Sequence, residues 1–252
     1  MGTRTKPGPA AGTRPAGVEP AQAAAHVRAM FDQIAPTYDR ANHLLSLSVD
    51  RYWRWRTVRM VRRALQESRL FPEPRVMDVC CGTGDLSLAL AAGLDGARIV
   101  GADFSHAMLA GASGKAPAIA WVQTDAMHLP CRDAACAAIT SAFGFRNLSD
   151  YRAGLREFYR CLTPHGVLAI LEISRPTAPL LQHVYPFYFE RVLPRLGGWI
   201  SGQPAAYRYL PDSVSRFPAP ATLALWIREA GFGSVRWQRF AGGIACLHLA
   251  VK

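Results

Sequence analysis

Residues 76–85, Val-Met-Asp-Val-Cys-Cys-Gly-Thr-Gly-Asp, constrain the fold of this chain more than any other stretch. An apolar run ends in Asp78, a turn of small residues follows, and an apolar helical pattern covers 86–92. Gly82 and Gly84 suit this turn because glycine adopts positive φ angles and lets a ligand approach the bare backbone. The free N–H groups of the following helix would point into the same crevice. The stretch therefore predicts a strand, a tight turn and a helix around a ligand site.

The next strand-like run, 98–103, ends in Asp103, which stands 19 residues after Gly84. Nucleotide-binding α/β units place at about this distance the carboxylate that binds both ribose hydroxyls. Asp78 can also accept hydrogen bonds from a polar group in the crevice. The turn lacks G-x-G-x-x-G spacing, which argues against a dinucleotide, and no G-x-x-x-x-G-K-[ST] phosphate loop is present. These residues favour a nucleoside site over the alternative that the glycines only shape a strand-to-helix turn.

The pattern D-x-C-x-G-x-G resembles the first motif of S-adenosylmethionine-dependent methyltransferases, with Cys80 at the first of three usual glycine positions. The resemblance implies S-adenosylmethionine as cofactor, with Thr83 in its binding turn. Residues 119–125 form a third strand-like run that ends in Asp125. Its carboxylate can accept the adenine amino group, while the N–H of Ala126 meets a ring nitrogen.

A formal net charge of +11 comes almost wholly from arginine, since the lysines are only Lys6, Lys115 and Lys252. Such an excess indicates a polyanionic partner, nucleic acid or an anionic membrane, although a coding bias toward arginine would look the same. We expect no nucleic acid.

The six cysteines (80, 81, 131, 136, 161 and 246) show no zinc-site spacing, so we expect no metal and six reduced core thiols. No run reaches about 18 apolar residues, and the N-terminus lacks an apolar segment of the signal-peptide kind. We therefore expect a cytoplasmic protein.

Residues 1–22 are rich in Pro, Gly, Ala and Thr, which predicts a disordered tail, with a transit peptide as the alternative. From residue 23 the apolar spacing becomes helical, with Val27, Met30, Phe31 and Ile34 on one face. The segment 51–63 contains six arginines and no acid beside Tyr52 and Trp55. It is either a surface helix that covers the sheet edge or a basic surface that rests on anionic lipid.

A closer resemblance starts at VRAMFDQIAPTYDRAN (27–42) and continues through VMDVCCGTGDLSLALA, GADFSHAML and TDAMHLP. It includes AFGFRNLSDYRAGLREFYRCLTPHGVLAILEIS and YRYLPDSVSRFPAPATLALWIREAGF, and so runs from about Val27 to the end. These blocks resemble the ubiquinone/menaquinone biosynthesis C-methyltransferases. The paired cysteines and the EIS end of the fifth strand are more similar to the menaquinone branch. The resemblance implies a lipophilic demethylated quinol as acceptor, with the ubiquinone-pathway quinol as the alternative.

The elements of the second half agree with an α/β, Rossmann-like class I fold, a mostly parallel seven-stranded sheet with helices on both faces. We expect strands at 137–143 and 167–173, a helix at 151–162 and a helix at 221–230, with an antiparallel edge pair at 235–240 and 244–251. Residues 23–252 then form one methyltransferase domain with a helical cap (23–70). The dense apolar segment 175–215 is either a core helix pair or a lid that holds a lipid tail and rests on a membrane.

The methylated ring carbon becomes nucleophilic when the hydroxyl beside it loses a proton, so the site must favour that loss. Arg146 is the first catalytic candidate, because its charge can lower the hydroxyl pKa or hold a water that takes the proton. Asn147 can orient the hydroxyl, and Tyr38 can close the site. The alternative for Arg146 is a salt bridge with Asp150; His43, His128 and His183 are other possible bases.

Two departures from the family pattern affect the pocket: Ala142 replaces Ser or Gly, and Ser48-Val49 replaces a glycine-containing turn. Three rival functions remain: an RNA methyltransferase, a non-catalytic subunit of a quinone-biosynthesis complex and another small-molecule methyltransferase. The intact Thr83, Asp103 and Asp125 argue against the non-catalytic subunit. A homo-oligomer and contact with the inner face of a membrane stay open.

Overall fold

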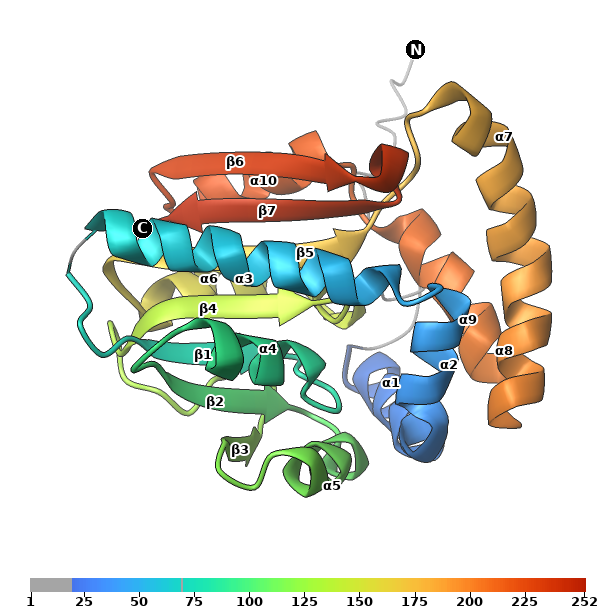
Figure 1. Cartoon of the computed structure of the whole chain (residues 1–252), viewed down its shortest axis with the longest axis horizontal. Coiled ribbons are helices and arrows are strands. Elements are labelled where there is room, and N and C mark those ends of the chain that lie inside the picture. Colours follow the sequence, from blue (N-terminus) through green and yellow to red (C-terminus); the bar gives the residue numbers. More distant parts are fainter. Residues whose placement is uncertain (1–19, 69) are drawn as a thin grey trace, which may run out of the picture.

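The computed structural model describes residues 20–68 and 70–252, which are built around one seven-stranded sheet (Figure 1). The strands are β1 (Arg75–Val79), β2 (Arg98–Asp103), β3 (Ala120–Gln123), β4 (Cys136–Ala142), β5 (Leu162–Ile173), β6 (Ser234–Phe240) and β7 (Ala245–Val251). Their order is β3-β2-β1-β4-β5-β7-β6, and only β7 runs antiparallel to its two neighbours. The predicted sheet, including the antiparallel pair at one edge, is confirmed.

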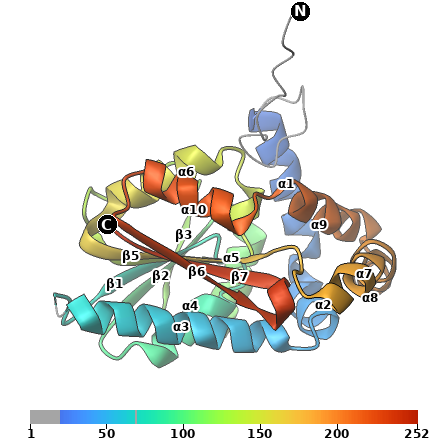
Figure 2. The same cartoon turned by 90° about the horizontal axis from the view of Figure 1, so that it is seen from above.

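Helices cover both faces of the sheet (Figure 2). The helices α3 (Val49–Ser68) and α4 (Asp85–Gly93) pack on one face, and α6 (Tyr151–Cys161) and α10 (Pro220–Glu229) on the other. Successive strand side chains alternate between faces, so Val76 packs with α3 and α4 while Met77 packs with α6 and α10. The helix α5 (His106–Lys115) lies beside β2 and β3.

The arginine-rich segment 51–63 lies within α3, whose apolar stripe of Val58, Val61 and Leu65 is buried against the sheet. Tyr52 and Trp55 remain on its exposed side. The helix therefore covers one face of the sheet; Arg51, Arg59, Arg62 and Arg63 are exposed, whereas the largely buried Arg54 pairs with Asp50.

The N-terminal helices α1 (Pro20–Ile34) and α2 (Tyr38–Leu45) lie beyond the carboxyl ends of the parallel strands (Figure 1). The predicted cap (23–70) also included α3, which instead covers the sheet, so the name cap below means α1 and α2 alone. Val27 and Ile34 are buried, which confirms the helical spacing of this segment. The helix begins at Pro20, so the predicted tail (1–22) extends three residues too far; residues 1–19 lie outside the described part. Proline suits a first helical turn because its missing N–H has no partner there.

The segment after β5 forms α7 (Pro179–Phe187), a π-helical stretch (Tyr188–Val192), α8 (Leu193–Ser201) and α9 (Pro204–Arg216), together called the lid. The π-helical stretch stands between Pro186 and Pro194, each of which lacks the N–H of a regular helical bond. Lid and cap share a hydrophobic cluster, separate from those on the sheet. No helix in the described ranges is long and apolar enough to cross a membrane.

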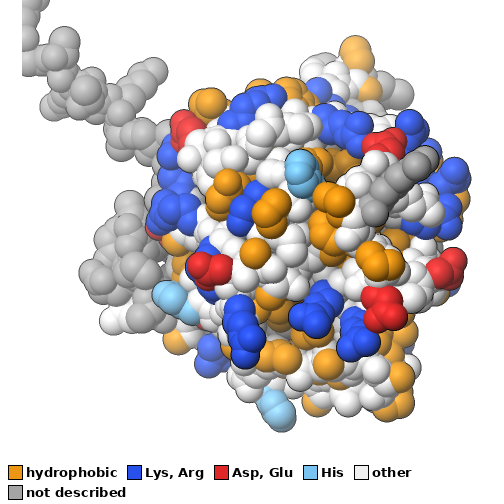
Figure 3. Space-filling view, turned by 90° about the vertical axis from the view of Figure 1, so that its left-hand side faces the viewer, with side chains coloured by type: hydrophobic (Ala, Val, Ile, Leu, Met, Phe, Trp, Pro, Cys, Tyr) orange, Lys and Arg blue, Asp and Glu red, His pale blue; other side chains and the backbone are white. Residues whose placement is uncertain are grey.

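Cys131 and Cys161 are joined as a disulfide, so the prediction of six reduced cysteines is wrong for this pair. Cys80, Cys81, Cys136 and Cys246 are free. Figure 3 shows the end of the molecule away from the lid, where lysine and arginine side chains are spread between small hydrophobic groups. At this end of the molecule the positive side chains are scattered and do not form one continuous patch.

Candidate active site

The turn between β1 and α4 is held open by left-handed backbone conformations. Gly82 and Gly84 have φ angles of 56° and 85°. A Cβ atom at Gly84 would lie 2.5 Å from Cη2 of Trp121, whereas one at Gly82 would meet nothing closer than Tyr38 Cε1 at 3.9 Å. Gly84 thus permits close packing below the turn, and Gly82 leaves free space above it.

Asp103, at the end of β2, fastens the turn to the neighbouring strand. Its Oδ2 accepts the N–H of Gly82 at 2.8 Å, and its Oδ1 accepts the N–H of Ser105 at 2.9 Å. Burial raises the pKa of this carboxyl although these N–H bonds oppose the shift. A carboxylate has about four acceptor positions, so Asp103 retains capacity for hydroxyl groups of a ligand.

Asp78, at the end of β1, is fully buried below the turn. It accepts hydrogen bonds from Ser87 Oγ at 2.6 Å and from Thr140 Oγ1 at 2.8 Å. Burial raises the pKa of Asp78 to about 6, while the two hydroxyls act against the shift. Both carboxylate oxygens are thus engaged within the protein.

A cleft that is partly open to solvent lies above the carboxyl ends of β1, β2 and β4; together with the open space at its mouth it has an empty volume of about 1060 Å³. Eight predicted site residues line it: Tyr38, Asp78, Gly82, Thr83, Asp103, Asp125, Ala126 and Asn147. Gly84 and Arg146 do not line it; they lie behind its wall. The side chain of Asp125 is half-exposed and accepts the N–H of Met127 at 2.9 Å. Sequence analysis did not find Arg28 and Phe104, which also line the cleft, with the Arg28 guanidinium 5.7 Å from the ring centre of Phe104.

Polar contacts fasten the cap to the turn. Thr83 Oγ1 donates a hydrogen bond to Asp39 in α2. Lys115 Nζ lies 2.8 Å from both Asp39 Oδ2 and Asp85 Oδ1, and so links the cap to α4 and α5. Access to the cleft therefore depends on the position of the cap.

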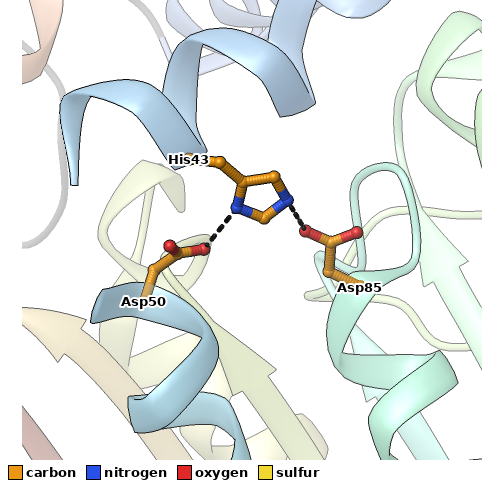
Figure 4. Close-up of side chains that lie close together, drawn as sticks. All are labelled: His43, Asp50 and Asp85. Carbon is orange, nitrogen blue, oxygen red and sulfur yellow. Dashed lines mark hydrogen bonds and ion pairs between the residues drawn. The ribbon is translucent and has the colours of Figure 1, made fainter. Parts of the chain in front are cut away.

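His43 lies between two carboxylates at the junction of cap, α3 and α4 (Figure 4). Its Nδ1 is 3.1 Å from Asp50 Oδ2, and its Nε2 is 3.4 Å from Asp85 Oδ2. These three residues have metal-ligand chemistry, but Asp50 also pairs with Arg54, and Asp85 with Lys115. Because both carboxylates already have cationic partners, the group is better suited to join the helices than to hold a cation.

The other two histidines named as bases are placed less centrally. His128 is exposed, and its Nδ1 lies 3.5 Å from Asp125 Oδ2. The side chain of His183 lies outside the described part.

Arg146, after β4, forms its ion pair with Glu172 at the end of β5. The Arg146 backbone N–H donates to Glu172 Oε1 at 2.9 Å, and Nη1 lies 3.1 Å from Oε2 and also donates to the carbonyl of Phe143. The alternative of a salt bridge with Asp150 is wrong, because Asp150 instead caps α6 by accepting the N–H of Ala153 at 2.9 Å. Burial acts most strongly and would lower the pKa of Arg146, but Glu172 together with the phenols of Tyr38 and Tyr209 outweighs it, so the pKa is raised and the guanidinium stays charged.

Tyrosines from the cap and the lid surround this pair. Tyr209 in α9 donates its hydroxyl to Asn147 Oδ1 at 3.1 Å. Tyr38 and Tyr185 lie within electrostatic range of Arg146, and burial raises the pKa of both phenols, which keeps them protonated near neutral pH. Sequence analysis missed Glu172, Tyr185 and Tyr209. The signal for Glu172 was an acid in the otherwise apolar run LAILEIS.

A sheet of this order with its cleft above β1 and β2 is the fold of the Rossmann-like, S-adenosylmethionine-dependent methyltransferases. The similar solved structures include one from Thermotoga maritima described as a possible histamine N-methyltransferase, with TM-score 0.62, 18% identity and coverage of 90% of this chain and 100% of that one. Residues 20–252 match the model of the ubiE/COQ5 methyltransferase family, and this chain belongs to that family.

The curated relatives agree. A demethylmenaquinone methyltransferase of Thermus thermophilus is 46% identical over 87% of this chain and 98% of its own length. One from Deinococcus radiodurans is 44% identical over 90% of this chain and 92% of its own length. A ubiquinone/menaquinone biosynthesis C-methyltransferase of Syntrophotalea carbinolica is 44% identical, with 88% and 92% coverage. The chain is thus a methyltransferase whose relatives act in quinone biosynthesis.

Proposed function

We propose that this enzyme transfers a methyl group from S-adenosylmethionine to a ring carbon of demethylmenaquinol in menaquinone biosynthesis. The observation that carries the proposal is the 46% identity to a demethylmenaquinone methyltransferase over nearly the whole of that protein. The demethylated quinol of the ubiquinone pathway is the second candidate, favoured by the similarity to a C-methyltransferase named for both quinones.

The cleft suits S-adenosylmethionine. Asp103 would bind the ribose hydroxyls, and Asp125 and Ala126 would bind the adenine. Gly82 and Thr83 would contact the rest of the cofactor. Asp78 would support the turn from below. The free space above Gly82 and the remaining acceptor capacity of Asp103 support this assignment. When bound, the cofactor supplies an electrophilic methyl group.

The residues around Arg146 would prepare the acceptor. The buried guanidinium would lower the pKa of the ring hydroxyl next to the methylated carbon, or hold the water that takes its proton. Glu172 holds Arg146 in place because its Oε2 pairs with the guanidinium and its Oε1 accepts the backbone N–H. Asn147 would orient the hydroxyl, and Tyr38 would close the site from the cap.

The proposal includes the setting of the reaction. An isoprenoid quinol resides in a membrane, so the enzyme would work in the cytoplasm in peripheral contact with an anionic inner membrane face, without nucleic acid. A homo-oligomer is compatible with it.

Methyl transfer from labelled S-adenosylmethionine to chemically reduced demethylmenaquinol, and in parallel to the demethylated ubiquinol precursor, tests the proposal. Turnover of the naphthoquinol alone identifies the menaquinone branch, and turnover of both identifies a shared enzyme. Cofactor binding without methylation of either acceptor would contradict the proposal.

Arg146→Ala should abolish nearly all turnover and retain cofactor binding. Arg156→Ala, on the exposed side of α6, is the matched control and should remain active. If the Arg146 variant loses cofactor binding while the Arg156 variant keeps it, Arg146 does not have the catalytic role.

A further inference from the structure

The helical run of α7, the π-helical stretch and α8 has two different sides. Phe189 and Leu193 are buried in the cluster shared with the cap. The outer side exposes Phe187, Leu196 and Trp199, with 59%, 44% and 85% of their surfaces accessible. Single exposed apolar side chains are ordinary, but three on one helical run, one of them a tryptophan, suit an interaction surface.

The same outer side contains a shallow groove whose lining includes Phe187, Trp199 and three arginines, Arg191, Arg195 and Arg208, beside the single acid Glu190. The guanidinium of Arg191 lies 5.9 Å from the ring centre of Phe187. Aromatic groups next to arginines on a helix suit a lipid headgroup layer, because the rings enter the interface while the guanidinium groups stay at phosphate level.

A further exposed apolar side chain lies at a corner of the chain that packs against the lid. Leu47, at the corner between α2 and α3, exposes 83% of its surface. The corner is tied to the lid because Tyr188 donates its hydroxyl to the carbonyl of Leu45 at 2.7 Å. The helices α2 and α8 also pack against each other.

We propose that the outer side of the lid, defined by Phe187, Arg191, Arg195, Leu196 and Trp199, docks the enzyme on the surface of an anionic lipid bilayer. Charge complementarity selects this partner, since the groove has three arginines and one acid. The inference rests on the proposed function in one respect: a quinol with an isoprenoid tail is held by the bilayer. The same helical run places Tyr185 near Arg146 on its inner side, so docking brings the lipid surface and the acceptor site to opposite sides of one helix.

Co-sedimentation of the full chain with vesicles tests this surface. The vesicles contain phosphatidylcholine with or without phosphatidylglycerol, and the salt concentration is varied. We expect binding to anionic vesicles that weakens as salt rises. Arg191→Gln with Arg195→Gln should weaken binding about 25-fold, at about fivefold for each arginine. Trp199→Ala should also weaken it.

Two control sets locate the surface. Arg236→Gln with Arg239→Gln, and Trp237→Ala, change exposed residues of the edge strand β6 and should leave vesicle binding unchanged. Arg59→Gln with Arg62→Gln changes the exposed side of α3. If the α3 or β6 variants lose binding and the lid variants do not, the assignment to the lid is wrong.

Other partners give distinct results. Competition by transfer RNA at equal charge concentration, or loss of a dimer in sedimentation experiments on the lid variants, would overturn the lipid assignment in favour of nucleic acid or a second copy. Equal binding to both vesicle types would also overturn it. Methyl transfer to a short-chain, water-soluble demethylnaphthoquinol separates the two proposals: activity without vesicle binding refutes only the surface, and vesicle binding without activity refutes only the function.

Discussion

Asp78→Asn should stabilise the free protein and weaken its cofactor site. In the folded protein the pKa of Asp78 is raised from the ordinary value of 3.8 to about 6, chiefly because the carboxyl is buried. Since the folded pKa is the higher one, ionisation of Asp78 destabilises the native state. This destabilisation is complete above pH 6 and disappears as the pH falls toward 3.8.

The shift of about two pKa units corresponds to roughly 3 kcal/mol at pH 8 and to about 1 kcal/mol at pH 4.5. Asparagine carries no charge and can still bond to the hydroxyls of Ser87 and Thr140, which rotate to donate or accept. The variant should therefore be more stable by these amounts. Urea unfolding of both proteins at the two pH values measures the difference, and calorimetric titration with S-adenosylmethionine should show weaker binding.

Asp95→Asn, at an exposed position, serves as the control and should change stability little at either pH. A variant at Asp78 that is less stable than the parent at pH 8 would refute the reasoning. So would a gain that is the same at both pH values.

Three further outcomes follow from buried contacts. Glu172→Gln removes the charge that holds Arg146. We expect kcat to fall roughly a hundredfold in steady-state kinetics and the free energy of unfolding to fall by roughly 3–5 kcal/mol in urea. An unchanged kcat would contradict the positioning role of Glu172. Gly84→Ala should destabilise by roughly 1–3 kcal/mol because its φ is 85° and its Cβ would meet Trp121, whereas Gly114→Ala, with nothing within 4 Å, should not. Burial lowers the pKa of His248 from 6.5 to about 4. The folded state therefore favours the neutral imidazole, and this stability is lost as the pH falls from 6.5 through 4. In urea unfolding, His248→Gln should lose less stability between pH 7 and pH 4.5 than the parent protein does.

The positions of the residues proposed to bind the cofactor were predictable because their signals are local. Asp78 and Gly82 stand four residues apart, and Asp103 ends the next strand along the chain. Parallel strands that follow each other through one helix become neighbours, as β1 and β2 do. Sequence spacing alone therefore placed these residues at one edge of the sheet.

The partner of Arg146 was not predictable in this way. The alternative drawn from the sequence paired it with Asp150, four residues away, whereas Asp150 is used as a helix cap. Glu172 reaches Arg146 because β4 pairs with β5, with Ala142 opposite Leu171. That register depends on the whole sheet. The disulfide between Cys131 and Cys161 likewise joins a loop to the end of α6, and no local pattern in the sequence indicated it.

The cluster shared by cap and lid has a consequence for the order of events in a turnover. Ile34 and Ala41 come from the N-terminal helices and Leu193 and Val214 from helices far along the chain, yet they pack together. Displacing either group alone would expose the apolar side of the other, so this cluster couples the positions of cap and lid. We therefore expect a substitution in this cluster to change the exchange rates of methyl donor and acceptor together.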